Sequence, residues 1–390
     1  MEVLAIEPYD GGSHHAFLSA LDRYSRHRWR FATLPARHWK WRMRSAPMAI
    51  LNQVAELAAS REPDALLCSD MLDLATWLGF AARDRRLHDW VTRVPIVVYF
   101  HENQWVYPPA PGSRVDHHYA FTNLTSAAAA NECWFNSEFN RRTFLEESRA
   151  FLRRMPDDQD VVDVQAVEER SHVLTPGFDH PSVTNDGPTL ARKRGPASFS
   201  AASNSSPLRI GWVGRFEHDK RPDRFLELLT QLNSMAVDFQ LILLGERGRQ
   251  ADHLDELKRR FADQILHDGF APTTMEYEKW LGKLDVAVST ADHEFFGIAF
   301  CQAIWAGAIP VAPNDLSYVE YVPRSLRYES LPHAANLVAE ISKRTPLQPE
   351  DSVWQAWQAC RKQIEPLRAA PAVAAIDDQL QRLIDSTARP

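Results

Sequence analysis

The sequence predicts an α/β protein with two doubly wound domains, and three observations support this fold class. Short apolar runs recur along the chain, each followed by a polar or glycine-containing turn and a helix-like segment, which is the pattern of parallel βα units. The length of 390 residues exceeds what one ordinary core holds. A stretch rich in Ser, Ala, Pro and Gly, from Thr184 to Pro207, separates two such series and has no periodicity.

These observations set the expected domain boundaries. We predict an N-terminal Rossmann-like domain over residues 1–180, a flexible linker over 181–207 and a C-terminal Rossmann-like domain over 208–364. The chain closes with helical patterns, and we expect the helix at about 365–390 to pack back on the first domain. Two such domains would face each other across a cleft, where a ligand would bind.

Composition restricts the class of protein. Hydrophobic residues make up 45% and charged residues 24% of the chain, as in soluble globular proteins. No apolar run approaches the roughly 20 residues that span a bilayer, and the N-terminus lacks the basic region of a signal peptide. The cysteines are far apart in apolar contexts, which predicts buried thiols in a reducing compartment. We therefore expect a cytoplasmic protein without a membrane partner. The four cysteines are Cys68, Cys133, Cys301 and Cys360.

The first domain shows the alternation of strands and helices that defines a doubly wound fold. Its apolar runs are short, and two of them are continuous and rich in β-branched residues, which is typical of buried parallel strands. The expected strands are residues 2–7, Pro63–Ser69, Val94–Phe100, Glu132–Asn136 and His172–Thr175. The expected helices are Ala16–Tyr24, Asn123–Asn131 and one that begins after Ser137 as its N-cap.

Two positions in this domain are candidates for ligand contact. Gly11 and Gly12 follow the first strand and would let the backbone approach a ligand, although the sequence here is not G-x-G-x-x-G and a plain βα turn fits it as well. His101 follows the strand Val94–Phe100 directly and precedes Glu102, Asn103 and Gln104. Doubly wound folds bind ligands just past the carboxyl ends of their strands, so His101 is a candidate base, hydrogen-bond donor or structural residue.

One basic segment stands out in a chain whose formal net charge is −7. Between Arg23 and Arg44 lie eight Lys or Arg residues and no Asp or Glu, with Trp29, Phe31, Trp39 and Trp41 interleaved. Cations can pair with phosphates, and aromatic rings can stack on unpaired bases. The segment therefore indicates either a nucleic-acid contact or a solvated basic face anchored by tryptophans.

The second domain repeats the alternation of strands and helices. The expected strands are Leu208–Val213, Phe239–Leu244, Ile265–Gly269, Asp285–Ser289 and Ile309–Ala312. The expected helices are Asp223–Ser234, Val353–Ile364 and Ala374–Ser386, and another is predicted within residues 292–310.

Phosphate-binding candidates follow these strands. Arg215 and Lys220 flank the loop after Leu208–Val213, where two cations could neutralise a diphosphate, or where they could form ion pairs at the start of a helix. Gly245 ends the next strand. Gly269 ends the strand Ile265–Gly269 and Phe270 follows it, at a place where backbone groups could read the edge of a base.

The segment from Asp292 to Pro310 passes from a polar loop through one glycine into an apolar helix. Glu294 would place a carboxylate beside the backbone amides of Phe296, Gly297 and Ile298, and those amides and the helix dipole favour an anion. This combination suits a ligand that carries both phosphate and hydroxyl groups, such as a sugar nucleotide. No His/Cys cluster predicts a metal, and no Ser-His-Asp signature is present.

The layout resembles retaining glycosyltransferases of the GT-B architecture, two Rossmann-like domains that face each other across a cleft. Their donor site carries a Glu-x7-Glu motif, of which this chain has Glu294 but Gln302 at the second position. Gly214, Arg215 and Lys220 resemble the diphosphate-binding motif of that group. The resemblance implies that Gln302 lies at the nucleotide ribose, where its carbonyl can still accept a hydrogen bond.

A narrower resemblance covers most of the chain apart from the linker and the tail. E-P-Y-D-G-G-S-H, T-L-P-A-R-H-W-K-W-R, Y-F-H-E-N-Q, F-N-S-E-F-N, R-F-E-H-D-K and H-E-F-F-G-I-A look like the tRNA-queuosine alpha-mannosyltransferase family. The resemblance implies transfer of mannose from GDP-mannose to the cyclopentenediol of queuosine in the anticodon of tRNA-Asp. It implies no cofactor and no metal.

The resemblance also implies roles for the candidate residues. His101 and Glu294 would be catalytic. The donor would be held by Gly11, Gly12, Arg215, Lys220, Gly245, Gly269, Phe270, Phe296, Gly297, Ile298 and Gln302. The acceptor tRNA would contact His14, Arg37, Trp39, Lys40, Trp41, Arg42, Glu102, Asn103 and Gln104.

Two other functions remain open from the sequence. The first is a GT-B glycosyltransferase that uses another nucleotide sugar and a small-molecule, lipid or glycan acceptor, in which case the basic segment is only a solvated face. The second is a non-catalytic module that binds a sugar nucleotide or RNA, which Gln302 favours and the set of Glu294, Arg215, Lys220 and His101 opposes.

Overall fold

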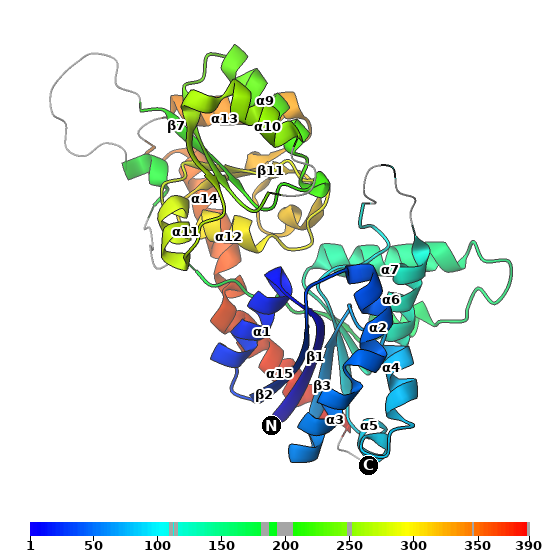
Figure 1. Ribbon diagram of the computed structural model, residues 1–390. Helices are drawn as coiled ribbons and strands as arrows, with labels where there is room; N and C mark the ends of the chain where they lie inside the picture. The colour runs from blue at the N-terminus through cyan, green and yellow to red at the C-terminus, as the bar shows by residue number, and fades with distance from the viewer. Residues whose placement is uncertain are drawn as a thin grey trace. The chain divides into compact units, whose positions relative to one another are not determined.

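The computed structural model describes residues 1–108, 112, 116–180, 187–192, 206–247, 252–344 and 347–387. The chain divides into two compact units (Figure 1). Unit 1 comprises Met1–Phe178 and Leu367–Pro390, and unit 2 comprises Asp179–Pro366. Each unit is built around its own parallel sheet, so each is described by itself below.

Unit 1 contains a six-stranded parallel sheet with the strand order β2-β1-β3-β4-β5-β6. The register pairs Val3 of β1 with Ala65 of β3, and Leu66 of β3 with Ile96 of β4. The strands are β1 (Glu2–Asp10), β2 (Arg28–Pro35), β3 (Ala65–Ser69), β4 (Ile96–Phe100), β5 (Glu132–Phe135) and β6 (Ser171–Val173).

The helices of unit 1 cover both faces of this sheet. In Figure 1, α1 and α15 lie on one face, and α2 and α4 lie on the other. This split follows from right-handed crossovers, because the chain moves from β1 to β2 in one direction and from β2 to β3, β4, β5 and β6 in the other. The helices are α1 (Gly12–Tyr24), α2 (Trp39–Ala49), α3 (Leu51–Ser60), α4 (Leu74–Ala81), α5 (His88–Val91), α6 (His117–Ala129), α7 (Glu138–Leu152), α8 (Val164–Glu169) and α15 (Ala369–Thr387).

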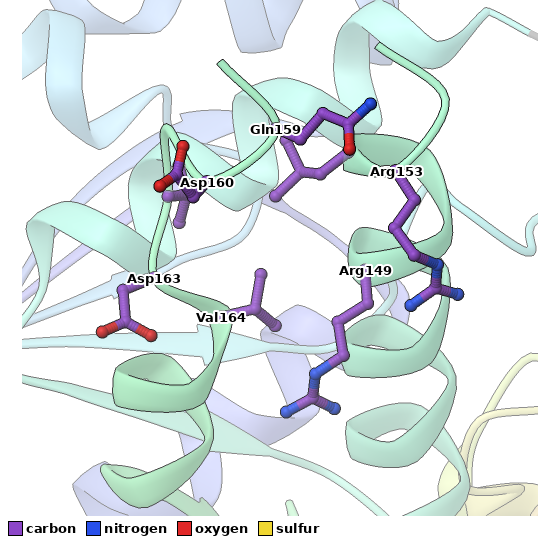
Figure 2. A pocket seen from close by; sticks show the side chains of 8 residues that line it. Arg149, Arg153, Gln159, Asp160, Asp163 and Val164 are labelled. Carbon is purple, nitrogen blue, oxygen red and sulfur yellow. The ribbon is translucent and has the colours of Figure 1, made fainter. Parts of the chain in front are cut away.

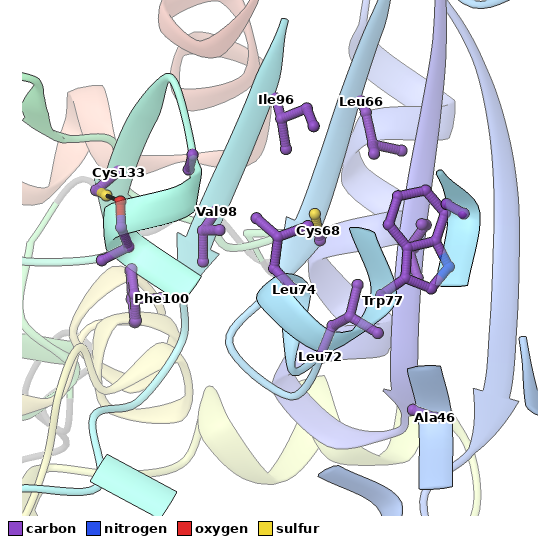
Figure 3. Packing of buried hydrophobic residues seen from close by; sticks show 14 of the residues in the cluster. Ala46, Leu66, Cys68, Leu72, Leu74, Trp77, Ile96, Val98, Phe100 and Cys133 are labelled. Atoms are coloured by element: carbon purple, nitrogen blue, oxygen red, sulfur yellow. Dashed lines mark hydrogen bonds between the residues drawn. The ribbon is translucent and has the colours of Figure 1, made fainter. Parts of the chain in front are cut away.

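Alternate residues of the central strands are buried in two separate cores, one on each face of the sheet, because successive side chains of a strand point to opposite faces. Leu66 and Cys68 of β3 pack with Trp77 of α4 in the larger core, part of which Figure 3 shows. Ala65 and Leu67 of the same strand face the smaller core, beneath α1 and α15. Both faces of the sheet are thus apolar, which explains why β3 and β4 read as continuous hydrophobic runs.

The C-terminal helix α15 belongs to unit 1. Its residues Val373, Ile376 and Leu380 are buried in the smaller core with α1. The carboxylate of Asp377, which is 2% exposed, accepts hydrogen bonds from Ser25 Oγ (2.5 Å) and from the backbone N–H of Arg26 (2.8 Å). This buried polar contact joins α15 to the end of α1 through residues about 350 positions apart in the chain.

Unit 2 contains a second six-stranded parallel sheet, with the order β12-β11-β10-β7-β8-β9. Counted from β7, this is the strand order of a classical Rossmann fold. The strands are β7 (Leu208–Val213), β8 (Phe239–Leu244), β9 (Ile265–Gly269), β10 (Val286–Val288), β11 (Ile309–Pro313) and β12 (Arg327–Tyr328).

The helices of unit 2 also lie on both faces of its sheet. Helix α9 packs against α10 and α13, and α12 packs against α14; Figure 1 shows these two groups on opposite sides of the strands. The helices are α9 (Pro222–Ser234), α10 (Asp252–Arg260), α11 (Thr274–Leu281), α12 (Ile298–Trp305), α13 (Leu331–Lys343) and α14 (Ser352–Ile364).

The α/β fold class predicted from the sequence is confirmed by these two sheets, but several elements of unit 1 were not predicted. The basic segment contains the edge strand β2 and the start of α2. Strand β2 was missed because charged residues at alternate positions do not look like part of a buried sheet. In the structure, Arg28 and Arg30 both pair with the buried carboxylate of Glu2, at 3.6 and 3.5 Å. In unit 2, strand β12 was also missed, since it has only two residues.

Of the predicted linker, residues 181–186 and 193–205 lie outside the described residues. Residues 187–192 contain a short 3-10 helix, Thr189–Arg192, and the backbone N–H of Thr189 donates to the Gly307 carbonyl at 2.9 Å. All four cysteines are buried thiols, as predicted. In the part of the chain that the structure describes, no helix has both the length and the apolar character needed to cross a membrane.

Candidate active site

The strand orders locate one candidate half-site in each unit. In open parallel sheets, ligands bind beyond the carboxyl ends of neighbouring strands whose following helices lie on opposite faces. In unit 1 this point lies between β1 and β3, because α1 and α4 cover opposite faces. In unit 2 it lies between β7 and β10, which are followed by α9 and α12. The loops after these strands and the helix starts that follow them carry several of the predicted site residues, among them Gly11, Lys220 and Glu294.

In unit 2, Lys220 and Glu294 form the centre of the half-site. They come from the loops after β7 and β10, and Lys220 Nζ lies 3.0 Å from Glu294 Oε2. The same ammonium donates to the carbonyl of His293 at 2.7 Å and lies 3.3 Å from Asp219 Oδ2. Two residues predicted separately from the sequence are therefore in direct contact, and one cation links both loops.

The environment of Lys220 keeps it charged. Burial disfavours the ammonium form, but the carboxylates of Glu294 and Asp219 outweigh this, and the pKa of Lys220 is raised above its ordinary value. The side chain of Lys220 is 19% exposed and that of Glu294 is 22% exposed. A ligand in this half-site would thus meet a positive charge and a carboxylate that are both partly accessible.

A second set of contacts holds the two loops together. Thr290 Oγ1 donates to the carbonyl oxygens of Lys220 (3.1 Å) and Arg221 (3.0 Å). Arg221 Nη1 donates to Asp292 Oδ2 at 2.6 Å, and its guanidinium also pairs with Asp223. Arg221 has a left-handed backbone (φ 56°) immediately before α9. These bonds connect the loop that carries Lys220 to the loop that carries Glu294.

Helix α12 begins at this half-site. Its N-cap is Gly297, with φ 86°, a conformation that favours glycine. A Cβ atom at Gly297 would lie 2.8 Å from the hydroxyl of Tyr321, which donates to the Phe296 carbonyl at 3.0 Å. Phe296 is buried and Ile298 is partly exposed. The chain thus makes a tight turn between Glu294 and the start of α12, at a glycine whose position leaves no room for a side chain.

Gln302 lies one turn into α12. Its carbonyl oxygen Oε1 accepts a hydrogen bond from Tyr277 Oη at 3.1 Å, and its amide Nε2 donates to the Asp179 carbonyl at 3.0 Å. Gln302 therefore connects α12 to α11 and to the first residue of unit 2. The sequence did not indicate this pair of hydrogen bonds, because Tyr277 and Asp179 are distant in the chain.

The glycines at the carboxyl ends of β7, β8 and β9 bring the backbone of three strands close together. A Cβ atom on Gly245 would lie 1.9 Å from the Gly214 carbonyl oxygen, so only glycine fits there. The N–H of Gly245 donates to the Gly269 carbonyl at 3.2 Å. Phe270, next to Gly269, is 68% exposed, and Arg215 is exposed after Gly214.

In unit 1, the chain leaves β1 through Gly11, the N-cap of α1, and Gly12, whose φ is 56°. His14 lies in the first turn of α1 and is buried, at 5% exposure. Its Nδ1 lies 2.9 Å from Glu7 Oε2. His14 was predicted as an acceptor contact, and the structure instead places it inside unit 1 beside a carboxylate.

His101 follows β4 and is 4% exposed. Its ring centroid lies 4.0 Å from that of His14 and 4.7 Å from that of Tyr99. Its backbone N–H donates to Asp70 Oδ1 at 3.0 Å, and its carbonyl accepts from Asn136 Nδ2 at 2.7 Å. His101 thus joins the loops after β1, β3 and β4 at the carboxyl edge of the sheet.

Burial and charge shift the pKa values of this cluster in opposite directions. Burial and the nearby charge of His14 lower the pKa of His101 well below its ordinary value. For His14, burial is the largest effect and opposes the charged form, but the charge and hydrogen bond of Glu7 together with the charges of Asp70 and Glu102 outweigh it and raise the pKa of His14 to about 9. Burial raises the pKa of the Asp70 carboxyl to about 8.

The three residues after His101 have different positions. Asn103 is fully buried, and its amide Nδ2 donates to Asn140 Oδ1 at 2.8 Å; its Oδ1 accepts from the N–H of Trp105 at 3.2 Å. Such a side chain shapes the loop and is not placed to touch a macromolecule. Glu102 and Gln104 are partly exposed.

The basic segment separates into a structural part and an exposed part. Arg28 and Arg30 pair with Glu2, and Arg44 lies 3.8 Å from Asp73. The predicted acceptor residues Arg37, Trp39, Lys40, Trp41 and Arg42 lie at the start of α2 and just before it, and Trp41 is 67% exposed. Tyr119 of α6, which the sequence did not indicate, receives cation–π contacts from Lys40 (5.7 Å) and Arg44 (5.4 Å).

Among the described residues, Glu7, His14 and His101 bring three potential metal-ligand atoms within 4.8 Å of one another. The 2.9 Å contact between Glu7 and His14 is that of a hydrogen-bonded ion pair. The sequence did not predict this cluster, because its members lie at residues 7, 14 and 101. The EPYDGGSH and YFHENQ motifs, which contain them, were its only signal.

A pocket of about 400 Å³ lies elsewhere in unit 1, between the end of α7 and the segment before α8 (Figure 2). Arg149 and Arg153 line one side and Asp160 and Asp163 the other. Arg149 is already paired with Glu168 of α8. The mixed charges do not favour a particular ligand, and none of the predicted site residues is part of this pocket.

Comparison with known proteins identifies the class first. Residues 194–324 match the family Glycosyl transferases group 1. The structure of Anabaena HepE in complex with UDP aligns with a TM-score of 0.66 at 15% identity, over 99% of this chain and 100% of that one. The lipopolysaccharide outer core galactosyltransferase WaaB aligns with a TM-score of 0.61 at 11% identity, over 98% of this chain and 99% of that one. The chain is a glycosyltransferase with the GT-B fold.

The family follows from two further matches. Residues 2–178 match the family described as tRNA-queuosine alpha-mannosyltransferase N-terminal. The tRNA-queuosine alpha-mannosyltransferase of Drosophila melanogaster is 30% identical over 330 residues, which are 84% of this chain and 83% of the fly protein. The chain belongs to the tRNA-queuosine alpha-mannosyltransferase family, and the resemblance inferred from its motifs is confirmed.

Proposed function

We propose that this chain transfers mannose from GDP-mannose to the cyclopentenediol of queuosine in the anticodon of tRNA-Asp, with retention of configuration. The main support for this reaction is that the chain belongs to the tRNA-queuosine alpha-mannosyltransferase family. The contact between Lys220 and Glu294 supports a donor site in unit 2, because it joins a cation and a carboxylate 74 residues apart at the sheet edge where such folds bind nucleotides.

The donor would be bound by unit 2. Arg215 and Lys220 would stabilise the negative charge that develops on the leaving diphosphate, and the amides around Gly297 would add to this at the start of α12. Glu294 would hold hydroxyl groups of the sugar. Gln302 would face the ribose with the lone pair of Oε1 that Tyr277 does not use.

The acceptor hydroxyl would attack from the face that the diphosphate leaves, and a phosphate oxygen would take its proton. This path uses no nucleophile of the protein. His101 of unit 1 would contact the sugar or the acceptor hydroxyl through its imidazole. Catalysis would then come from the positioning of donor and acceptor and from fixed charges that stabilise the leaving diphosphate.

The tRNA would meet the exposed part of the basic segment. Lys40 and Arg42 are cations near the start of α2, and Trp41 exposes most of its ring. Cations paired with backbone phosphates and a ring available for base stacking are what a single-stranded anticodon loop requires.

The test is mass spectrometry of nucleosides from queuosine-containing tRNA incubated with the protein and GDP-mannose. We expect a queuosine species heavier by one hexose, and none with tRNA that lacks queuosine. Parallel reactions with UDP-glucose and GDP-glucose test the donor. Transfer to another acceptor, or no turnover of any sugar nucleotide, would refute the proposal.

A further inference from the structure

A buried ion pair in unit 1 has no part in the reaction described so far. His14 and Glu7 lie 2.9 Å apart, and their side chains are 6% and 2% exposed. Glu7 Oε1 accepts two more hydrogen bonds, from Ser69 Oγ (2.9 Å) and from the backbone N–H of Tyr9 (2.8 Å). Glu7 thus accepts hydrogen bonds from three donors, and its contact with His14, whose pKa is raised to about 9, is a buried hydrogen-bonded pair.

This pair lies directly against His101. The His14 and His101 ring centroids are 4.0 Å apart, with 36° between the ring planes. Phe17 meets the His101 ring edge-on at 5.2 Å and Tyr99 lies at 4.7 Å. With its backbone held by Asp70 and Asn136, His101 has a restricted ring orientation.

Among the described residues, His101 Nε2 has no hydrogen-bond partner although it is buried. An unpaired nitrogen in such a place costs free energy unless a ligand satisfies it. His101 lies at the carboxyl edge of the sheet, directly after β4, where unit 1 would meet a substrate.

We propose that Glu7 and His14 are positioning residues for His101: the fixed positive charge of His14 keeps the His101 imidazole neutral and, with Phe17 and Tyr99, holds Nε2 ready for the substrate. The proposal rests on the proposed function, since it takes His101 to touch the sugar or the acceptor. Two imidazolium ions in contact would repel each other strongly in a buried site, so only one of the two rings is charged. Glu7 determines that this ring is His14.

The other titratable groups around His101 are consistent with this assignment. Asp70 lies on the loop after β3, and burial raises its pKa to about 8, so it is mainly neutral at pH 7. Glu102 follows His101 and acts on both His14 and Asp70 through its charge. Burial raises the pKa of Tyr99 well above its ordinary value, so the phenol stays neutral.

The kinetic test is the pH dependence of kcat/KM for His14→Gln, which keeps a donor toward Glu7 but removes the charge. With a carboxylate and no cation beside it, His101 gains protons at higher pH, and we expect the ratio of activities at pH 5.5 and 7.5 to fall about 10-fold relative to wild type. His15→Gln is the matched control, because His15 pairs with Asp10 at 2.7 Å in the same turn but is 65% exposed. It should leave the profile unchanged.

The double variant Glu7→Gln/His14→Gln keeps the shape of the pair without charges and guards against a folding defect. We expect its acid limb to lie between those of wild type and His14→Gln. Histidine-labelled NMR of the protein without substrate reports the protonation of His101 directly, with His101→Gln as the assignment variant. This readout stands even if the protein transfers no mannose.

Three outcomes would overturn the proposal. One is a His101 signal that titrates near its ordinary pKa in wild type. Another is a His14→Gln profile parallel to wild type with only the rate reduced, as a purely structural role would give. The third is a stoichiometric metal ion in the purified protein that Glu7→Gln abolishes, because the pair would then be ligands.

Discussion

At the scale of single residues, Lys220 of unit 2 has several polar partners at once. Its ammonium is shared between Glu294, Asp219 and the His293 carbonyl. The cation holds the loop of Glu294 in place, and in the proposed reaction it would also offer positive charge to a diphosphate. Removing it would then affect both the geometry of the carboxylate proposed to hold the sugar and the charge at the leaving group.

We predict that Lys220→Met lowers kcat by about 10²–10³-fold, the range found when one preorganised charge-stabilising donor is removed. Single-turnover transfer to queuosine-containing tRNA is the measurement. Lys343→Met is the control, because Lys343 is 68% exposed and pairs with Glu340 in the preceding turn of its own helix. A kcat within twofold of wild type would exclude Lys220 from the transition state.

Gln302 differs from the usual Glu of the motif, and the structure gives a reason for the amide. The Nε2 group donates to the Asp179 carbonyl, which a carboxylate cannot do. We predict that Gln302→Glu lowers the melting temperature by about 2–4 °C, equivalent to roughly 1 kcal/mol from the missing hydrogen bond and an oxygen–oxygen repulsion. Calorimetry tests this. A rise in melting temperature would show that the hydrogen bond to Asp179 contributes nothing.

At the scale of elements, the start of α12 depends on Gly297. Its φ of 86° and the 2.8 Å approach of the Tyr321 hydroxyl to a Cβ atom leave no room for a side chain. The position of the helix amides relative to Glu294 follows from this one residue.

We therefore predict that Gly297→Ala destabilises unit 2 by about 1–3 kcal/mol and weakens donor binding. Thermal unfolding and titration with GDP-mannose are the measurements. Gly79→Ala in α4 is the control, because that backbone is helical and nothing lies within 4 Å of the added Cβ; alanine should be neutral or stabilising there. Equal effects of both changes would contradict the argument.

The exposed part of the basic segment lies at the start of α2 and just before it. We predict that the triple variant Arg37→Ala/Lys40→Ala/Arg42→Ala weakens tRNA binding and reduces the slope of log affinity against log salt by about 1 for each phosphate that is no longer neutralised. Filter binding at several salt concentrations measures both quantities. The variant Lys343→Ala/Arg344→Ala/Lys362→Ala removes the same charge from unit 2 and should change the slope less. An unchanged slope in the α2 variant would make that surface only a solvated face.

At the scale of the whole molecule, the buried cluster of unit 1 makes stability depend on pH. Folding raises the pKa of His14 from 6.5 to about 9, so its stabilisation is complete below pH 6.5 and is lost as the pH rises through 9. Asp70 acts in the same direction, since its folded pKa of about 8 is above 3.8. His101 acts oppositely below pH 6.5, because its folded pKa is lowered.

We therefore predict that the melting temperature of unit 1 falls between pH 6.5 and 9. The decline between pH 8 and 9 comes mainly from His14 and should be smaller in His14→Gln. Calorimetry of both proteins at half-unit pH steps is the test, with His15→Gln as the control. A melting temperature that rises over this interval would show that the cluster binds no extra protons in the folded state.

Much of the fold could be predicted from the sequence, because buried parallel strands are continuous apolar runs. Strands β7, β8 and β9 were predicted to the residue, and β1, β3 and β4 to within a few positions. Strand β2 was not, since its arginines are satisfied by Glu2, a residue on the neighbouring strand. Local patterns do not contain such partners.

The candidate site, like the fold, could be predicted only in part from the sequence. The sequence by itself determined which polar residues follow strand ends, such as Glu294, Lys220 and His101, and its motifs determined the family. Only the tertiary structure decided which of them touch: Lys220 with Glu294, Gln302 with Tyr277, and His14 with Glu7 and His101. The physical reason is that strand order and sheet register bring distant loops to one edge, while burial decides whether a polar side chain there faces a ligand or another residue.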